Sequence, residues 1–228
     1  LSEKRKKLAE QKKQKKAKKH NLKAISPSDT EINILIHQYQ AGKYGEAEKL
    51  AISITQEFPQ HQFGWKALGA VLKQTGRLSE SLVASQKSVQ LAPLDAEAHS
   101  NLGFTLQQLG KLDEAKASLR QAIMLKPDFI EAHSNLGNTL KELSHQAANS
   151  AIQQSILEES LASHTKVIVL KPDFAEAHSN LGNTLKELGR LDEAEASCRQ
   201  AIALKPDFAE AHNNLGNTLK ELGRLDEA

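Results

Sequence analysis

The chain has 228 residues, of which 39% are apolar and only 4% are aromatic, and its formal net charge at pH 7 is +2. A core built mainly from Ala, Leu and Ile favours closely packed helices over a β-sandwich, because strands favour β-branched and aromatic residues. The single cysteine, Cys198, excludes an internal disulfide and a cysteine-rich zinc site. No run of eighteen apolar residues is present, so we expect no transmembrane helix and a cytoplasmic location.

Residues 1–27 are predicted to form a basic tail that is separate from the rest of the chain. Residues 1–23 carry eleven Lys and Arg against Glu3 and Glu10, a charge of +9, which leaves −7 for the remainder of the +2 total. The stretch Lys4–Lys23 has no aromatic side chain to stack on a base and no apolar face to enter a bilayer. We expect a solvated, partly helical tail, with salt-sensitive binding to nucleic acid or an anionic surface as the alternative.

An internal period of 34 residues follows the tail. Residues 171–194 recur as residues 205–228, and the two copies differ only at Ser179 and Asn213. The same offset relates His99 to His133, and Gly69 to Gly103. A fixed period of this length indicates a repeat protein made of helix–turn–helix units.

The residues at fixed places in this period resemble the tetratricopeptide signature of an aromatic residue, Leu-Gly, a further aromatic residue, Ala, an aromatic residue and Pro. One unit has His178, Leu181, Gly182, Leu185, Ala194, Cys198, Ala201 and Pro206 at these places. The resemblance covers residues 28–228 and implies an all-α, right-handed solenoid of helical hairpins whose first helices line a concave face. The predicted units are 28–61, 62–95, 96–129, 130–174 and 175–208, with a half-unit at 209–228.

Each unit is predicted to contain two helices, as residues 173–205 illustrate. Asp173 is expected to cap the first helix, with Glu176 completing a capping box. Gly189 is expected to end this helix and Pro206 to stop the second. Gly182 lies within the first helix, where we expect the two helices to approach closely. The first apolar stripe comprises Ala177, Leu181, Leu185 and Leu188, and the second comprises Leu191, Ala194, Cys198, Ala201, Ile202 and Leu204.

The fourth unit contains eleven extra residues, because its glycine at position 137 lies 45 residues before Gly182. The usual turn is replaced by residues 144–160. The stretch Ser150–Leu170 has no Pro or Gly and is predicted to be one long helix, capped by Asn149 or Ser150. We expect a lengthened turn and helix on the rim, with a partner-specific protrusion as the alternative.

The chain stops at Ala228, where a second helix would begin. Because solenoid ends need a polar capping helix, we expect the native polypeptide to continue. Any chemistry of the whole protein is therefore expected to lie outside this segment, which has no phosphate loop, paired catalytic carboxylates or nucleophile–base pattern.

Four histidines recur at the signature aromatic position. Zinc ligands must all lie within roughly 2.3 Å of the metal, whereas equivalent residues of neighbouring units are about one helix-packing distance apart or more. We therefore expect the rings to pack at the hairpin edge, and we expect no metal or cofactor. These residues are His99, His133, His178 and His212.

Asparagines recur two residues after the histidines, and a second set follows one helical turn later. An asparagine side chain offers two donors and an acceptor, so a row of them can hold the backbone of an extended peptide. The alternative is that they form hydrogen bonds only within the hairpins or with water. The predicted peptide-binding residues are Asn101, Asn135, Asn138, Asn180, Asn183, Asn214 and Asn217.

This row is similar to the concave asparagine array in the tetratricopeptide arm of protein O-linked N-acetylglucosamine transferases, and the surrounding His-Ser-Asn-Leu-Gly-Asn at 178–183 is similar too. The carboxylate clamp of some chaperone co-factors fits less well, because it requires a lysine just before the first asparagine. Those positions hold Ser100, Ser134, Ser179 and Asn213.

The leading hypothesis is a scaffold that binds extended segments of other proteins in a concave groove. The alternative that the resemblance implies is the non-catalytic, substrate-recruiting arm of a larger glycosyltransferase. A third hypothesis is nucleic-acid or anionic-surface binding through the tail.

Overall fold

The computed structural model describes residues 26–224 and residue 226, and this part of the chain folds into helices without any strand. The basic tail at Lys4–Lys23 and the terminal Ala228 lie outside the described residues. The predicted all-α solenoid of helical hairpins is confirmed. The helices are α2 (Asp29–Gln40), α3 (Tyr44–Glu57), α4 (Gln62–Gln74), α5 (Leu78–Leu91), α6 (Ala96–Gln108), α7 (Leu112–Leu125), α8 (Ile130–Ser144), α9 (Ser150–Leu170), α10 (Ala175–Glu187), α11 (Leu191–Leu204) and α12 (Ala209–Glu221).

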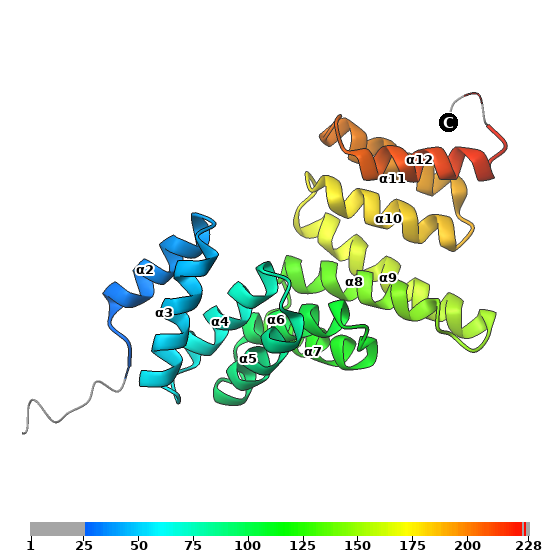
Figure 1. Cartoon of the computed structure of the whole chain (residues 1–228). Coiled ribbons are helices and arrows are strands. Elements are labelled where there is room, and N and C mark those ends of the chain that lie inside the picture. Colours follow the sequence, from blue (N-terminus) through cyan, green and yellow to red (C-terminus); the bar gives the residue numbers. More distant parts are fainter. Residues whose placement is uncertain (1–25, 225, 227–228) are drawn as a thin grey trace, which may run out of the picture.

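Successive helices pair into hairpins, and the hairpins follow a curved path from α2 to α12 (Figure 1). Each helix packs on the helix before and after it in the chain. The first helices of neighbouring hairpins also touch one another directly, in the pairs α4–α6, α6–α8, α8–α10 and α10–α12. None of the helices in the described part of the chain is long and apolar enough to cross a lipid bilayer.

The apolar core is divided into clusters that join one hairpin to the next. The first cluster brings together Leu35 of α2, Ile54 of α3 and Leu68 of α4. Another contains Leu119 of α7 and Leu140 of α8, with Ile156 of α9 packed against it. A hairpin therefore completes its core only with its neighbour, as expected for a solenoid.

The turn within the hairpin of α10 and α11 has the predicted glycine at its centre. Gly189 has φ of +73°, a left-handed conformation that glycine adopts without steric cost. Its amide donates to the Lys186 carbonyl, and the Arg190 amide donates to the Leu185 carbonyl, both at 2.9 Å. These two bonds are the Schellman arrangement that satisfies carbonyls at a helix end.

The predicted capping box of α10 is wrong. The N-cap residue is Phe174 rather than Asp173, and no side chain caps the helix. In α6 the equivalent N-cap position holds Asp95, whose carboxylate does accept from the amides of Glu97 and Ala98. The Pro-Asp-Phe order at 172–174 moves the acid one residue too early to reach the first-turn amides.

The close approach predicted at Gly182 is confirmed. A Cβ atom there would lie 2.6 Å from the Cys198 sulfur and 3.2 Å from the Ala194 carbonyl oxygen. Cys198 is fully buried, as predicted. The equivalent glycines of the preceding hairpins meet Ser85, Leu119 and His164 in the same way.

The recurring histidines tether each first helix to the proline turn before it. In each case the ring Nε2 lies 2.8–3.0 Å from a proline carbonyl oxygen six residues earlier, so it must donate a hydrogen. Trp65 makes the same bond from Nε1 to the Pro59 carbonyl at 2.9 Å. The ring at this position is therefore a hydrogen-bond donor at the hairpin edge. The histidine pairs are His99–Pro93, His133–Pro127, His178–Pro172 and His212–Pro206.

The long helix predicted in the fourth unit is confirmed as α9, with the predicted cap. The Asn149 side chain accepts from the Ile152 amide at 2.9 Å. Leu157 is the residue of α9 that corresponds to Leu112 and Leu191, the first residues of α7 and α11. The insertion therefore adds residues 150–156 to the start of a second helix of ordinary length.

Candidate functional site

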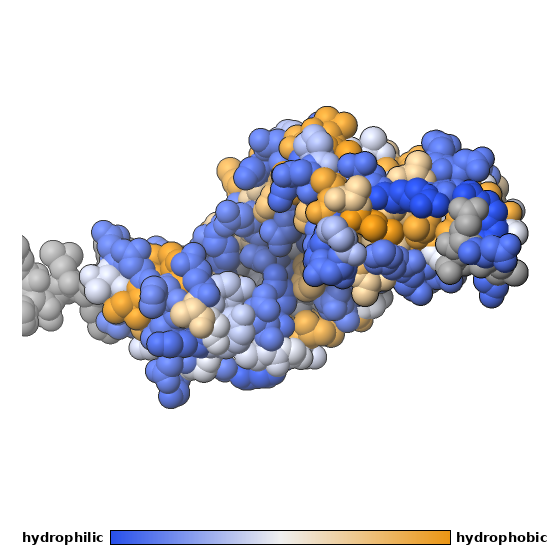
Figure 2. Space-filling view, turned by 90° about the horizontal axis from the view of Figure 1, so that it is seen from above, coloured by the Kyte–Doolittle hydropathy of each residue, from blue (hydrophilic) through white to orange (hydrophobic). Residues whose placement is uncertain are grey.

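Helices α4, α6, α8, α10 and α12 touch one another in succession, and α2 lines a pocket together with α4. We call the surface of these first helices the first-helix face. All seven predicted asparagines lie on its helices, in α6, α8, α10 and α12. Because neighbouring first helices touch, equivalent residues follow one another along this face. Figure 2 shows the molecule from above the view of Figure 1, with apolar patches among mainly hydrophilic residues at both ends of the molecule.

Two of the asparagines already have partners within the protein. Asn214 is 7% exposed and its Nδ2 donates to the Ser179 hydroxyl oxygen at 3.0 Å, joining α12 to α10. Asn101 is half-buried, and its Oδ1 accepts from Lys73 Nζ at 3.4 Å. Both bonds join the first helices of neighbouring hairpins, so they differ from the bonding within one hairpin that was the alternative to peptide binding.

The other asparagines make no side-chain hydrogen bond with the described part of the chain. Asn135 is half-buried, and its Nδ2 is buried without a partner. An unsatisfied buried amide of this kind gains free energy from an acceptor that reaches it. Half-buried Asn138, Asn180 and Asn183 and exposed Asn217 also keep their amide groups available.

A pocket of ≈ 320 Å³ lies at the N-terminal end of the first-helix face, and we call it the N-terminal pocket. Its apolar lining comes from α2 and α4. Tyr39 is held in place by the Gln74 amide, which donates to its hydroxyl oxygen at 3.2 Å, and by edge-to-face packing on Tyr44. The lining residues are Leu35, Ile36, Tyr39, Gln40, Phe63, Lys66, Ala67, Ala70, Glu97 and Asn101.

The charged groups at this pocket are paired with one another. Lys66 Nζ lies 3.0 Å from Asp95 Oδ2 and 2.8 Å from Glu97 Oε2. Burial lowers the pKa of Lys66, but its hydrogen bonds to Glu97 and Asp95 together outweigh burial and raise the pKa. Burial raises the pKa of Asp95, and the bonds from Gln62 and Lys66 outweigh it, so the Asp95 pKa falls.

Lys73 lies next to this pocket and has no acidic partner within the described residues. Its Nζ is 4.7 Å from the centre of the Phe104 ring and 3.4 Å from Asn101 Oδ1. Burial lowers the pKa of Lys73, and the more distant charge of Glu131 opposes the shift only in part. Lys73 was not predicted as a binding residue. It can be recognised in the sequence because neutral Gln74 follows it, whereas glutamates follow the equivalent Lys141, Lys186 and Lys220.

A second pocket of ≈ 420 Å³ lies further along, and we call it the turn pocket. It is bounded by two turns in which a lysine covers a phenylalanine ring, Lys126 over Phe129 at 5.0 Å and Lys171 over Phe174 at 4.8 Å. Asn135 lines this pocket, and the equivalent Asn101 lines the N-terminal pocket. The row of asparagines therefore contributes one residue to each of the two pockets.

The first-helix face offers two pockets, amide groups and charged side chains with which a ligand can be bound non-covalently. Burial raises the pKa of the Cys198 thiol to about 11, which keeps it protonated at neutral pH. Among residues 26–224, no group of three His, Cys, Asp or Glu side chains lies close enough together to hold a metal ion.

Comparison with known families identifies the repeats. A model of the TPR repeat matches residues 106–144 and 182–223. A second model, of the tetratricopeptide repeat, matches residues 84–117 and 165–196. No curated protein matches the sequence.

Solved structures share the fold. TTC0263, a thermophilic TPR protein of Thermus thermophilus, is 28% identical with a TM-score of 0.65, over 73% of this chain and 86% of that one. MamA is 20% identical with a TM-score of 0.64, over 79% and 93%. YrrB, a TPR protein with an unusual peptide-binding site, is 19% identical with a TM-score of 0.64, over 87% and 95%. The last two identities support a likeness of fold alone.

Proposed function

We propose that this chain, whose repeats match models of the tetratricopeptide repeat, is a scaffold that binds extended segments of partner proteins along the first-helix face. The observation that carries this proposal is the N-terminal pocket, whose apolar lining of Phe63, Ala67 and Ala70 is open to a side chain of a partner. Burying an apolar side chain there contributes about 1.5–3 kcal/mol. YrrB, which has the same fold, has a peptide-binding site.

The asparagine row would hold the backbone of the same segment. Asn135, Asn180 and Asn183 have amide groups without partners in the described part of the chain, on helices that follow one another along the face. Their donors and acceptors suit peptide groups of any sequence. Replacing these three residues by alanine is expected to weaken peptide binding and leave helicity intact.

The other predicted functions have less support. The matching family models describe the repeat itself, so the likeness to the transferase arm stays a prediction. Nucleic-acid or anionic-surface binding was assigned to residues outside the described part of the chain and also stays a prediction.

The proposal is tested by selecting short random peptides displayed on phage against the full chain, and measuring the affinity of synthetic copies by fluorescence anisotropy. The variant Ala70→Phe fills the N-terminal pocket and should weaken binding at least about tenfold, the equivalent of 1.4 kcal/mol. The same substitution at exposed Ala117 of α7 is the control and should leave affinity unchanged. If no peptide is enriched, or if Ala70→Phe binds every peptide as the parent does, the proposed function is wrong.

A further inference from the structure

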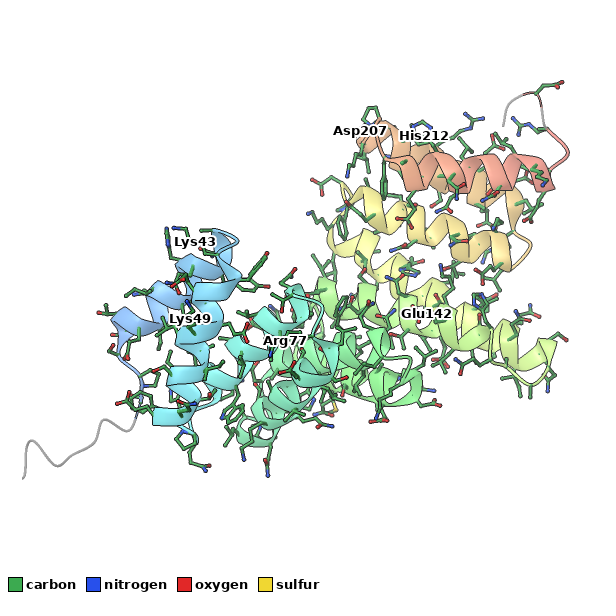
Figure 3. All side chains as sticks on the ribbon, viewed as in Figure 1. Lys43, Lys49, Arg77, Glu142, Asp207 and His212 are labelled. Carbon is green, nitrogen blue, oxygen red and sulfur yellow. The ribbon has the colours of Figure 1, made fainter. Side chains whose placement is uncertain are left out.

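Lysines occupy one position in the C-terminal half of four first helices, and in three of them a glutamate follows. These glutamates form contacts between neighbouring units. Glu142, labelled in Figure 3, accepts a hydrogen bond from Gln107 Nε2 at 2.7 Å. Glu187 lies 3.0 Å from His145, and Glu221 lies 4.0 Å from Lys186. In α4 neutral Gln74 takes the place of the glutamate, so Lys73 differs from the equivalent Lys141, Lys186 and Lys220.

The ammonium of Lys73 forms no salt bridge with the described residues, and the negative charge of Glu131 acts on it only from a longer distance. The two groups that contact its ammonium, the Phe104 ring and the Asn101 amide oxygen, are both neutral. In the described part of the chain, no carboxylate lies within 4.0 Å of this ammonium. A partly buried ammonium that has lost water and gained no anion is favourably placed to accept one.

The position of Lys73 relates it directly to the N-terminal pocket. Asn101 lines the pocket and also accepts from Lys73, so a single side chain separates the two. The other cation at the pocket, Lys66, is already bound to Asp95 and Glu97. An incoming carboxylate is repelled by these acids and attracted to Lys73, which has no salt bridge to the described residues.

We propose that Lys73 binds a carboxylate of the partner segment, so that this segment carries an acidic residue at a fixed spacing from the apolar side chain in the N-terminal pocket. This assignment rests on the proposed function and names the chemistry of its ligand. Asn101, between the two subsites, binds the backbone that connects them. The partner is thus an extended peptide with one apolar and one acidic anchor.

The test uses the full chain, the same random peptide library and the variants Lys73→Met and Lys220→Met. Methionine keeps the apolar stem on Phe104 and removes the charge. Lys220 is the matched control, since it occupies the same position in α12, is exposed and lines neither pocket. The basic residues 1–23 are identical in all variants, so any general attraction of acidic peptides by them cancels in the comparison.

Peptides selected by the parent chain should pair an apolar residue with Asp or Glu at one spacing, and those selected by Lys73→Met should keep only the apolar residue. A synthetic peptide with Glu should bind Lys73→Met about tenfold more weakly than the parent, as expected for a charge-assisted hydrogen bond. Its Gln counterpart should bind both alike, and Lys220→Met should behave as the parent.

Two outcomes separate this proposal from the proposed function. Equal affinity of the parent chain for the Glu and Gln peptides, with binding still lost in Ala70→Phe, overturns the role of Lys73 alone. Peptides whose affinity Ala70→Phe does not change overturn the proposed function.

Discussion

At the residue scale, the glycines within the first helices differ in what lies opposite them. Gly182 faces Cys198 of α11 at a distance that leaves no room for a methyl group. In α12 the equivalent residue is Gly216, and a Cβ atom there would have nothing within 4 Å in the described structure. The two glycines have nearly the same flanking sequence, but an added methyl group would clash only at Gly182.

We predict that Gly182→Ala destabilises the protein by about 1–3 kcal/mol, because the added methyl overpacks the helix crossing. Gly216→Ala should instead leave stability unchanged or raise it by up to about 1 kcal/mol, since alanine is the better helix former and the site is open. Urea unfolding followed by circular dichroism measures both. Equal effects of the two substitutions would contradict the prediction.

Single residues were predicted from sequence with uneven success. The period placed the glycines, buried Cys198 and the rings at the hairpin edge, because each depends on packing that recurs from unit to unit. The hydrogen bonds from these rings to the proline carbonyls were not predicted. The partners of Asn214 and Lys73 could not be predicted, since they depend on whether a side chain of one helix reaches across to the next. The N-terminal pocket was missed because α2, which forms one wall, has no Leu-Gly signature.

At the scale of elements, the hairpin of α8 and α9 has a histidine where its neighbours have apolar or small side chains. His164 is fully buried against Gly137, and neither of its ring nitrogens has a hydrogen-bond partner in the described structure. Burial lowers its pKa to about 3, and the positive charge of Lys141 acts in the same direction. The ring is therefore neutral in the folded protein near neutral pH.

This hairpin should lose stability in acid. The unfolded chain binds a proton at His164 below its ordinary pKa of about 6.5, whereas the folded chain does not until about pH 3, so stability falls as the pH drops between these values. From pH 7 to pH 5 the expected loss is about 2 kcal/mol. His164→Leu, which copies Leu119 at the equivalent position of α7, should remove this part of the pH dependence in urea unfolding.

The control for this measurement is His37→Gln, which removes an exposed histidine of α2. It should retain the acid loss that His164→Leu abolishes. A pH dependence that is the same in the parent and in His164→Leu would show that this histidine does not set it.

Helices were more predictable than their ends. The long helix α9 and its Asn149 cap followed from a stretch free of Pro and Gly behind a capping residue. The caps of the first helices were not predictable in the same way. Asp95 occupies the N-cap position of α6 and caps it, whereas Asp173 lies one residue before the N-cap position of α10 and makes no capping hydrogen bond.

At the scale of the whole molecule, contacts run from each hairpin to the next, so local stability depends on how many neighbours a helix has. Helix α10 packs on α8, α9, α11 and α12, whereas within the described residues α12 packs on α10 and α11. Their sequences differ only at Ser179 and Asn213. This pair therefore separates the effect of position from the effect of sequence.

We predict that backbone amides of α12 exchange with deuterium at least about tenfold faster than the equivalent amides of α10. Fewer neighbours mean a lower free energy for local opening, and a difference of about 1.4 kcal/mol gives this ratio. Because the two sequences are nearly identical, intrinsic exchange rates cancel. Equal protection of the two helices would mean that the solenoid opens as one unit.

The ring tethers have a consequence for how such an array can change in length. Each bond joins a proline carbonyl of one unit to a ring N–H of the following unit, as in Pro172 with His178 and Pro206 with His212. Each of these boundaries has a proline carbonyl as acceptor on its N-terminal side and a ring N–H, from a histidine or from Trp65, as donor on its C-terminal side. Duplication or loss of a whole unit re-forms this bond at the new junction and leaves no carbonyl unpaired there. The near identity of residues 171–194 and 205–228 is what recent duplication along such interchangeable junctions would produce.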